Sequence, residues 1–515
     1  MKRIVFIVCV LCHIACVFGQ AKNDAGFLPV STPEAQGVSS VGIAAFLDGA
    51  KELTGLEMHG FVLLRHGKTI AKAAWKPYET SNKHTLYSVS KSFTATAIGL
   101  AIHDGKLKLS DKVISFFPDD LPGNISPYLA QLCIRDLLTM TMGQNPEPAY
   151  TGFDNWVKPA LAGPVINEPG TRFLYNNLGP FLLSAILQKV TGQKIIDYLR
   201  PGLFEPLGIT DVDYETNPQG INVGGYGLRL SVESMAKFGQ LYLQKGKWNG
   251  RQLIPEDWVT EATKIQIDQG PSWVPAAAKQ TSDWSQGYGY FFWRCNHNAY
   301  RADGAMGQFI VVMPEQDAVV AITSNTSDMQ AELNLVWKYL LPAMKSAALP
   351  ENPAAQAGLK KKIAALKLPG LQSVKSEVEY ELTGKTFALE NNPLKLQKIS
   401  FWLDIDSPWK FILTDSTEHS FTMGEPGFVD GLTDMPGPSL TAGAKNSQQG
   451  LAPFKIAIST GFSRPHTIDF MVRYVESVHT QLYRITATGK EEIVLEIPDA
   501  IDTKKKVVIK GTLVK

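Results

Sequence analysis

The sequence predicts a mixed α and β domain followed by an all-β domain. With 515 residues, the chain is too long for a single hydrophobic core. Two apolar runs between 309 and 323 flank a Pro-Glu-Gln-Asp turn and predict a hairpin of buried strands. An apolar stripe over 89–101 predicts a buried helix. After Pro369-Gly370 the pattern changes to short alternating strands, which are typical of an antiparallel β-barrel or sandwich.

These patterns divide the chain into four parts. Residues 1–19 are expected to be a secretory signal peptide, because Lys2-Arg3 precedes an apolar run and Gly19 fits the cleavage rule. The first domain is placed at 20–345 and a linker at 346–372. The β domain is placed at 373–515. The protein is therefore expected in the periplasm or outside the cell, with a lipid anchor on Cys16 as a less favoured alternative.

Ser88 and Lys91 are the most informative pair in the sequence. They lie three residues apart at the start of the predicted helix, so their side chains share one face. A serine hydroxyl needs a neighbouring base to become a good nucleophile, and a buried lysine with a lowered pKa can be that base. The helix dipole also favours negative charge developing at this end. A capping role for Ser88 alone would leave the buried Lys91 unexplained.

Tyr175 and Asn177 form a second polar group. They lie in a turn just before an apolar helix predicted from about Leu178 to Val190. Such a loop can direct a phenol and an amide into a cleft. Packing of Tyr175 and helix capping by Asn177 is the alternative reading of this pair.

A third group runs from Tyr300 to Gln308, where Gly304 and Gly307 flank the start of the buried hairpin. Glycines beside a strand allow a ligand to approach the backbone closely.

In this order the three groups resemble the serine β-lactamase and penicillin-binding-protein superfamily, most closely the class C β-lactamases, DD-peptidases and related esterases and amide hydrolases. Three further stretches are similar to family segments: Gly60–Lys68, Leu137–Gly143 and Gly227–Gly239. The resemblance covers roughly 30–345. It implies an antiparallel sheet flanked by helices plus a helical subdomain, followed here by a β module that is often lipocalin-like in related hydrolases.

The resemblance also implies roles for individual residues. Ser88 would be the nucleophile, and Lys91 and Tyr175 would transfer protons. Asn177 would position the substrate, and backbone near Gly304 and Ala305 would supply an oxyanion N–H. Where the family usually has a Lys-Thr-Gly or His-x-Gly sequence, this chain has Ala302-Asp303-Gly304. The family cation is therefore missing unless Arg301 replaces it, which argues against efficient turnover of β-lactams.

The β domain is expected to contain about eight strands, beginning near Lys385 and ending near Leu513. Residues 424–450 are rich in Gly, Pro, Ser and Asn and predict a long loop. Trp402, Trp409 and Phe411 are possible members of a sugar-binding face, although strand aromatics are more often part of a core.

Composition limits the other possibilities. A net charge of +1 with well-mixed charges gives no basis for nucleic-acid binding. Apart from the signal, the sequence has no apolar stretch long enough to span a membrane. Cys133 and Cys295 are expected to be separate buried thiols. No cofactor or metal is expected, and the expected partner is a small-molecule, peptide or ester substrate; the oligomeric state stays open.

Two functions remain after this reading. The first is a secreted serine hydrolase that acts through an acyl-enzyme on an ester, amide or peptide. The second is a non-catalytic protein that keeps the fold and binds cell-wall or glycan fragments. A Ser-His-Asp triad using His66 or His84 is a weaker possibility, since both residues fall in predicted turns or loops.

Overall fold

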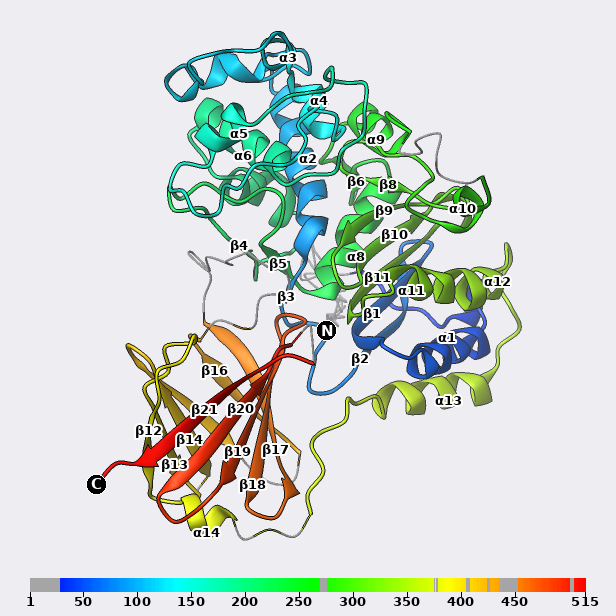
Figure 1. Ribbon diagram of the computed structural model, residues 1–515. Coiled ribbons are helices and arrows are strands. Elements are labelled where there is room, and N and C mark those ends of the chain that lie inside the picture. Colours follow the sequence, from blue (N-terminus) through cyan, green and yellow to red (C-terminus); the bar gives the residue numbers. More distant parts are fainter. Residues whose placement is uncertain are drawn as a thin grey trace, which may run out of the picture.

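The computed structural model describes residues 28–268, 276–374, 376, 378–403, 408–423, 427–435, 437, 453–500 and 504–515. The predicted signal peptide and Cys16 lie outside the described residues. Two bodies are visible in Figure 1, a larger α+β domain and a C-terminal β domain below it. None of the helices in the described ranges has the length and apolar character needed to cross a membrane.

The larger domain contains a six-stranded antiparallel sheet with the order β2-β1-β11-β10-β9-β8. Its strands are β1 (Glu57–Arg65), β2 (Lys68–Ala74), β8 (Trp293–Arg294), β9 (Tyr300–Gly304), β10 (Gln308–Met313) and β11 (Ala318–Asn325). The β10 and β11 strands are almost continuously apolar because helices cover both faces of the sheet. The predicted hairpin of buried strands is therefore confirmed.

One face of the sheet packs against helices from both ends of the domain, and the other packs against α8. The outer layer contains α1 (Ser40–Glu52), α11 (Met329–Leu335), a π-helical turn (Val336–Leu340), α12 (Leu341–Ala343) and α13 (Pro353–Ala364). The other face carries α8 (Val232–Leu243) and leads into a helical subdomain. From Met329 to Ala343 the chain therefore passes from α-helix through a π-helical turn and back to α-helix.

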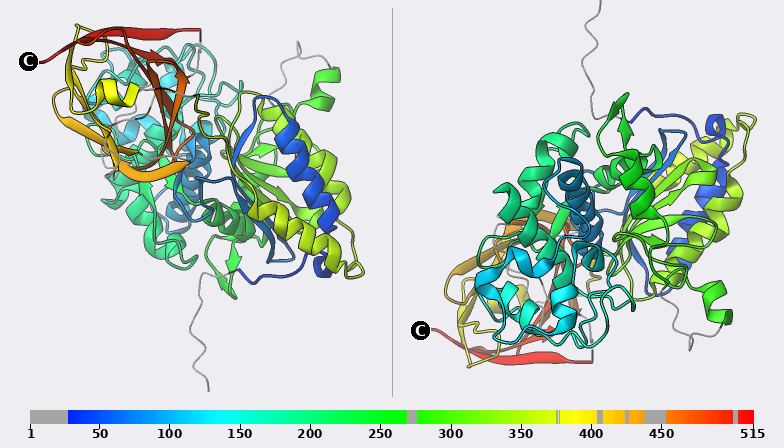
Figure 2. Two further views of the ribbon diagram at one scale, coloured as in Figure 1. Left: turned by 90° about the horizontal axis from the view of Figure 1, so that it is seen from below. Right: turned by 90° about the horizontal axis from the view of Figure 1, so that it is seen from above.

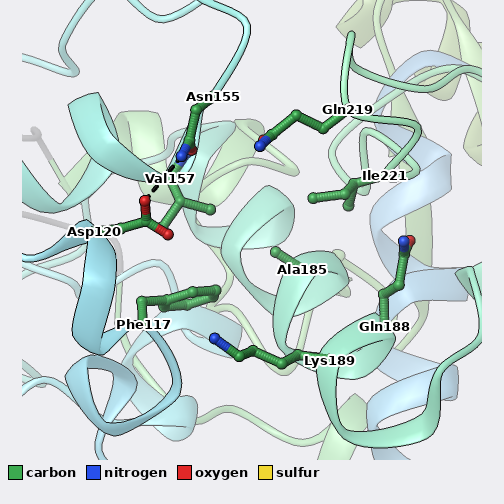
Figure 3. A pocket seen from close by; sticks show the side chains of 9 residues that line it. All are labelled: Phe117, Asp120, Asn155, Val157, Ala185, Gln188, Lys189, Gln219 and Ile221. Carbon is green, nitrogen blue, oxygen red and sulfur yellow. Dashed lines mark hydrogen bonds between the residues drawn. The ribbon is translucent and has the colours of Figure 1, made fainter.

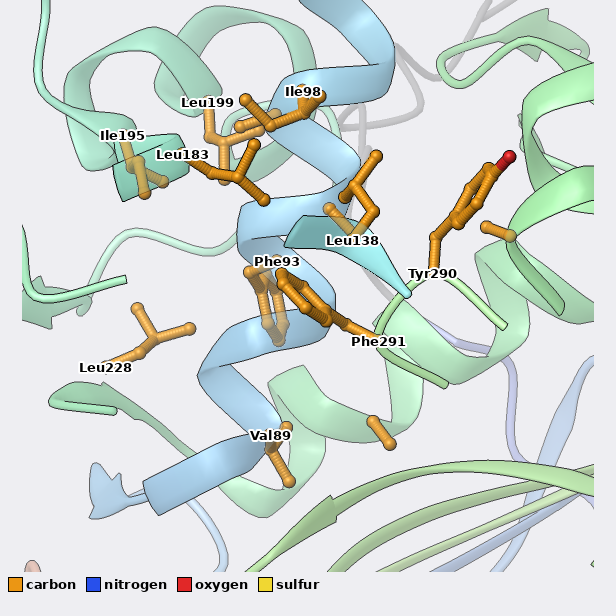
Figure 4. Packing of buried hydrophobic residues seen from close by; sticks show 14 of the residues in the cluster. Val89, Phe93, Ile98, Leu138, Leu183, Ile195, Leu199, Leu228, Tyr290 and Phe291 are labelled. Atoms are coloured by element: carbon orange, nitrogen blue, oxygen red, sulfur yellow. The ribbon is translucent and has the colours of Figure 1, made fainter. Parts of the chain in front are cut away.

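The helical subdomain surrounds α2 (Ser90–His103), which is buried along most of its length. Its other helices are α3 (Pro127–Gln131), α4 (Ile134–Leu138), α5 (Val157–Ala162), α6 (Leu178–Thr191), α7 (Ile195–Leu199) and α9 (Glu256–Thr263). The short helix α10 (Ala276–Thr281) lies apart from these, on the side of the six-stranded sheet (Figure 1). Figure 4 shows Phe93 and Ile98 of α2 packed among Leu138, Leu183, Leu199 and Phe291. This apolar cluster holds α2 in place, and α2 in turn fixes the residues at its N-terminal end.

A small three-stranded sheet lies where the two domains meet. It consists of β3 (His84–Thr85), β4 (Asp213–Tyr214) and β5 (Leu228–Leu230), with β5 in the middle. A separate short hairpin pairs β6 (Lys247–Trp248) with β7 (Arg251–Gln252).

The C-terminal domain is a ten-stranded antiparallel, nearly closed barrel preceded by α14 (Val378–Leu382). Its strands are β12 (Thr386–Leu389), β13 (Lys398–Trp402), β14 (Trp409–Thr414), β15 (Glu418–Met423), β16 (Phe428–Thr433), β17 (Phe454–Arg464), β18 (Thr467–Tyr474), β19 (Thr480–Ala487), β20 (Glu492–Pro498) and β21 (Lys506–Leu513). The predicted fold class is confirmed, with two strands more than expected.

The two additional strands are β15 and β16. The expectation of a loop over 424–450 was wrong for β16, which pairs with β17 in register; most of the rest of that segment lies outside the described residues. Aromatic side chains fill the barrel interior: Phe411 stacks on Phe421 and Phe470, each at 4.5 Å between ring centroids. Phe411 is therefore a core residue and faces no sugar-binding surface.

Candidate functional site

Ser88 lies in a tight 3₁₀ turn (Tyr87–Val89) that leads directly into α2. Tyr87, the residue before it, has a φ of 48°, in the left-handed region. A bulky residue rarely adopts this conformation, and it persists only where the surroundings enforce it. Val89 is fully buried in the apolar cluster shown in Figure 4. The turn therefore presents the Ser88 hydroxyl from a rigid support.

Lys91 follows one turn later on the same face, and its side chain is buried. Its Nζ atom lies 3.0 Å from Ser88 Oγ, 2.8 Å from Asn177 Oδ1 and 2.8 Å from the carbonyl oxygen of Gly225. Two of these neighbours can only accept a hydrogen bond. A neutral amine has two N–H groups and one lone pair, so donation to Asn177 and Gly225 leaves the lone pair for the Ser88 hydroxyl.

The electrostatic environment favours this neutral form. Burial lowers the pKa of Lys91 to about 7, and the charges of Glu147 and Asp303 oppose that shift. Desolvation disfavours the charged form of an amine, which explains the direction. Near neutral pH, a large fraction of Lys91 is therefore able to accept a proton from Ser88.

Tyr175 forms the opposite side of this group. Its hydroxyl interacts with Ser88, and its ring centroid lies 4.8 Å from Lys91 Nζ. Burial of the hydroxyl raises the pKa of Tyr175, and the interaction with Ser88 opposes the shift. The phenol therefore stays protonated at neutral pH and can donate a proton. Tyr175 as a whole is 41% exposed, and its ring centroid lies 5.7 Å from that of Trp293.

Asn177 stands at the start of α6 and is held by a residue that the sequence reading did not single out. Glu147 Oε1 accepts hydrogen bonds from the backbone N–H groups of Asn177 at 2.6 Å and Leu178 at 2.8 Å. A carboxylate at a helix N-terminus satisfies otherwise unpaired donors. Because Asn177 Oδ1 accepts from Lys91, its Nδ2 is the end available to a substrate carbonyl.

The turn between β9 and β10, residues 305–307, adjoins the Ser88 turn. A Cβ on Gly304 would lie 2.2 Å from the carbonyl oxygen of Leu86, so only glycine allows this approach. Ala305 and Met306 follow, and their carbonyl oxygens accept hydrogen bonds from Gln308 Nε2 at 3.2 Å and 3.1 Å. The geometry places the backbone near Gly304 and Ala305 beside the turn that carries Ser88.

A buried polar cluster supports the same turn from behind. Ser324 Oγ contacts the carbonyl oxygens of Met306 at 3.1 Å and Gly307 at 3.0 Å, and Glu332 Oε2 at 3.1 Å. One hydroxyl proton cannot serve three acceptors. Burial raises the pKa of Glu332 well above its ordinary value, so a protonated Glu332 can donate to Ser324. Sequence spacing contains no signal for this long-range cluster.

Arg301 is fully buried and lies beneath the site. Its Nε donates to Asp303 Oδ2 at 2.8 Å and its Nη1 to the carbonyl oxygen of Asp283 at 2.8 Å, while the guanidinium stacks over Trp284 at 4.3 Å. These contacts engage Nε and Nη1 of the group that was considered as a replacement cation, whereas its Nη2 is buried and has no hydrogen-bond partner among the described residues. In the Ala-Asp-Gly sequence, Ala302 is buried and pairs with Ile310 of β10. The charge of Asp303, the next residue, raises the pKa of Lys91.

Comparison with known proteins decides the family. The family model described as Beta-lactamase matches residues 51–343, more than half of the chain. The chain belongs to the beta-lactamase family. The resemblance found in the sequence is confirmed, and family membership makes the protein a β-lactamase-related serine hydrolase in the broad sense.

Individual relatives of this beta-lactamase family member are distant. Penicillin-binding protein 4* of Bacillus subtilis is 31% identical over 194 residues, which cover 34% of this chain and 41% of that protein. The 6-aminohexanoate-dimer hydrolase of Paenarthrobacter ureafaciens is 21% identical over 295 residues, covering 52% and 72%. Among solved structures, a putative beta-lactamase from Bacteroides dorei aligns with a TM-score of 0.50 and 15% identity, covering 59% of this chain and 99% of that chain, which shows the fold alone.

A pocket of about 290 Å³ lies elsewhere in the helical subdomain of this family member (Figure 3). Its lining includes Phe117, Asn155 and, near the C-terminal end of α6, Gln188 and Lys189. Asn177 at the other end of α6 is eleven residues from Gln188, about 16 Å along a helix. The pocket is therefore separate from the Ser88 site.

The histidines proposed for a triad are engaged elsewhere. His66 contacts Gln36 at 3.2 Å, and His84 contacts His59 at 3.0 Å and the carbonyl oxygen of Thr85 at 3.0 Å. Cys133 and Cys295 are both free thiols, with no disulfide between them, and Cys133 is only half-buried. Across the described part of the chain, no group of three His, Cys, Asp or Glu side chains has the arrangement of a metal site.

Proposed function

We propose that this protein is an exported serine hydrolase that forms an acyl-enzyme on Ser88 and acts on esters, amides or peptides outside the cytoplasm. The observation that carries the proposal is the environment of Lys91 Nζ. It has two carbonyl acceptors at 2.8 Å and the Ser88 hydroxyl at 3.0 Å. That arrangement suits an uncharged amine whose lone pair faces the nucleophile.

In the acylation step, Ser88 Oγ attacks the carbonyl carbon of the substrate while its proton moves to Lys91 Nζ. The carbonyl oxygen becomes an oxyanion, which backbone N–H groups of the Ser88 turn and of the 304–305 segment stabilise. The bond to the leaving group then breaks, and the leaving oxygen or nitrogen takes a proton from Tyr175, which is reprotonated by the Lys91 ammonium. Ser88 is left as an ester of the acyl group.

Deacylation repeats this sequence with water as the nucleophile. Lys91 Nζ removes a proton from the water, directly or through the Tyr175 hydroxyl, as the water attacks the acyl carbon. Collapse of the second tetrahedral intermediate breaks the bond to Ser88 Oγ, which recovers its proton from Lys91. Asn177 orients the acyl group through its Nδ2 donor. No group changes its oxidation state, and Ser88, Lys91 and Tyr175 end the cycle in the protonation states in which they began.

The charges around Ser88 favour substrates without a carboxylate. Asp303 adds negative charge near Lys91, and the nearby cation Arg301 is already paired with it at 2.8 Å. The aromatic rings of Phe173, Tyr175 and Trp293 lie next to one another and offer an apolar surface to an acyl chain.

Pre-steady-state hydrolysis of a short p-nitrophenyl ester tests the proposal. The wild type is expected to release a burst of p-nitrophenol equal to one active site, followed by slower turnover. Ser88→Ala should abolish both phases. Hydrolysis that persists in Ser88→Ala would contradict the mechanism, and a folded wild type without hydrolysis of any ester or amide tested would favour the non-catalytic binding protein.

A further inference from the structure

The barrel reaches into the hydrolase domain beside the nucleophile. The turn between β18 and β19, residues 475–479, is here called the barrel turn. The carbonyl oxygen of Glu476 accepts hydrogen bonds from the backbone N–H of Thr85 at 2.8 Å and from Thr85 Oγ1 at 3.3 Å. Thr85 lies in β3, three residues before Ser88. The barrel turn therefore adds a main-chain contact to the outer edge of the three-stranded sheet.

A buried ion pair connects the same turn to the middle strand of that sheet. Glu476 Oε2 lies 3.1 Å from Arg229 Nη1, and Arg229 also pairs with Asp213 at 2.7 Å. Arg229 is 0% exposed and Glu476 is 2% exposed. Without Glu476, Arg229 would keep Asp213 as its charge partner, but its buried Nη1 would lose its carboxylate acceptor, which is unfavourable. The guanidinium also stacks over Phe454 of the barrel at 4.9 Å.

The strand that carries Arg229, β5, forms hydrogen bonds with the residues on either side of the turn that carries Ser88. Next to Arg229, the carbonyl oxygen of Leu228 accepts a hydrogen bond from Leu86 N at 3.0 Å, and Leu228 N donates to Ser90 Oγ at 3.1 Å. Three residues earlier, the Gly225 carbonyl oxygen accepts from Lys91. The turn that carries Ser88 (Tyr87–Val89) is here called the nucleophile turn. Hydrogen bonds from Leu86 and to Ser90 thus connect it to β5 on both sides of Ser88.

Tyr87, whose left-handed backbone sets the direction of Ser88, also meets the barrel. Its hydroxyl is buried beside Ser477 and, among the described residues, has no hydrogen-bond partner. The neighbouring Tyr78 donates to the carbonyl oxygen of Ser477 at 3.3 Å. The barrel turn therefore closes the space behind a strained residue that would otherwise be free to relax.

We propose that the barrel turn positions the nucleophile turn, so that efficient acylation of Ser88 requires the docked barrel. Glu476 is the main positioning residue: its carbonyl oxygen holds β3 and its carboxylate holds β5. This inference rests on the proposed function, since it concerns the rate at which Ser88 is acylated. It assigns the C-terminal domain a part in catalysis although it contributes no group to the reacting atoms.

The test uses the full chain and measures the second-order rate constant of labelling by a fluorophosphonate, counted per labelled molecule. Two graded variants are Glu476→Gln, which keeps an acceptor for Arg229, and Glu476→Ala, which removes it. A third replaces 475–478 by Asn-Gly, a two-residue hairpin turn that leaves β18 and β19 joined. Asp469→Asn is the matched control, because Asp469 is a buried carboxylate that pairs with Arg484 at 2.8 Å inside the barrel.

The rate constant should fall in the order wild type, Glu476→Gln, Glu476→Ala, turn replacement. The last should lose on the order of a hundredfold, the effect of misplacing a reacting group by about 1 Å. Asp469→Asn should match the wild type, and the KM of a p-nitrophenyl ester should change less than kcat.

A purely structural role would overturn the inference: fewer molecules would be labelled, yet each would react at the wild-type rate. Equal rates in all variants would overturn it as well. Wild-type protein that is labelled at a residue other than Ser88 would instead refute the proposed function, and the two failures are therefore distinguishable.

Discussion

Lys91 Nζ lies 3.0 Å from Ser88 Oγ, and its other two neighbours at hydrogen-bond distance are the oxygens of Asn177 and Gly225. The sequence contains the cause of the first contact, since three residues on a helix bring two side chains together. The other two contacts come from segments more than eighty residues away. Both oxygens only accept hydrogen bonds, so a neutral Lys91 amine that donates to them keeps its lone pair for Ser88.

Replacing Lys91 by arginine should nearly abolish activity. A guanidinium stays protonated at any working pH and cannot accept the Ser88 proton. General base catalysis is worth about 10²- to 10⁴-fold, so kcat for a p-nitrophenyl ester should fall by that order. Lys189→Arg, a lysine beside the remote pocket, serves as the control and should be unaffected. More than a tenth of wild-type activity in Lys91→Arg would rule out the assignment.

The pH profile should report the Lys91 amine. Its pKa is lowered to about 7, and only the neutral amine is a base. The value of kcat/KM should therefore rise with pH, with an inflection near 7, and then level off. Asp303 raises the pKa of Lys91, so Asp303→Asn should move the inflection to lower pH. An inflection that moves to higher pH in that variant would contradict this electrostatic account.

Gly307→Ala should lower kcat in addition to the free energy of unfolding. A Cβ at this position would lie 2.1 Å from Ser324 Oγ and 2.2 Å from Glu332 Oε2, which would displace the 305–307 turn. The backbone φ is +89° at Gly307 and +80° at Gly250, but the space around Gly250 is open. Gly250→Ala is therefore a matched control for backbone strain. Both variants should lose about 1–2 kcal/mol of unfolding free energy through backbone strain, and Gly307→Ala should lose more because its Cβ overlaps Ser324 and Glu332. Only Gly307→Ala should also lower kcat per titrated active site, and equal kcat values would exclude the proposed role of the turn.

Substrate preference should follow the charge of Asp303. A chromogenic cephalosporin carries a carboxylate, whereas a p-nitrophenyl ester does not, and the wild type should have the higher kcat/KM for the ester. A charge-assisted hydrogen bond is worth about 1.5–3 kcal/mol, or roughly ten- to a hundredfold. Asp303→Asn releases Arg301 from its partner and should narrow the preference by about tenfold. Glu315→Gln, at the far end of β10, should leave it unchanged.

The parts of the structure that depend on local spacing could be predicted from the sequence. The Ser88–Lys91 pair, α6 after Asn177 and the β10–β11 hairpin all follow from periodicity within one segment. The orientation of Ala302 and Asp303 could not be predicted, because a shift of one residue in strand register exchanges the two faces. Glu147, Gly225 and Glu332 carry no local signal, since they reach the site from loops and helices distant in sequence. The strands β15 and β16 were missed because polar residues and glycine interrupt their alternation.

Peptide mapping after labelling with a fluorophosphonate tests the central claim most directly. The account predicts one label per molecule, located on Ser88 in the peptide that contains the turn before α2, and no label in Ser88→Ala. Lys91→Arg should remain folded but react far more slowly at the same serine. A label on another serine, together with hydrolytic activity that survives in Ser88→Ala, would contradict the account.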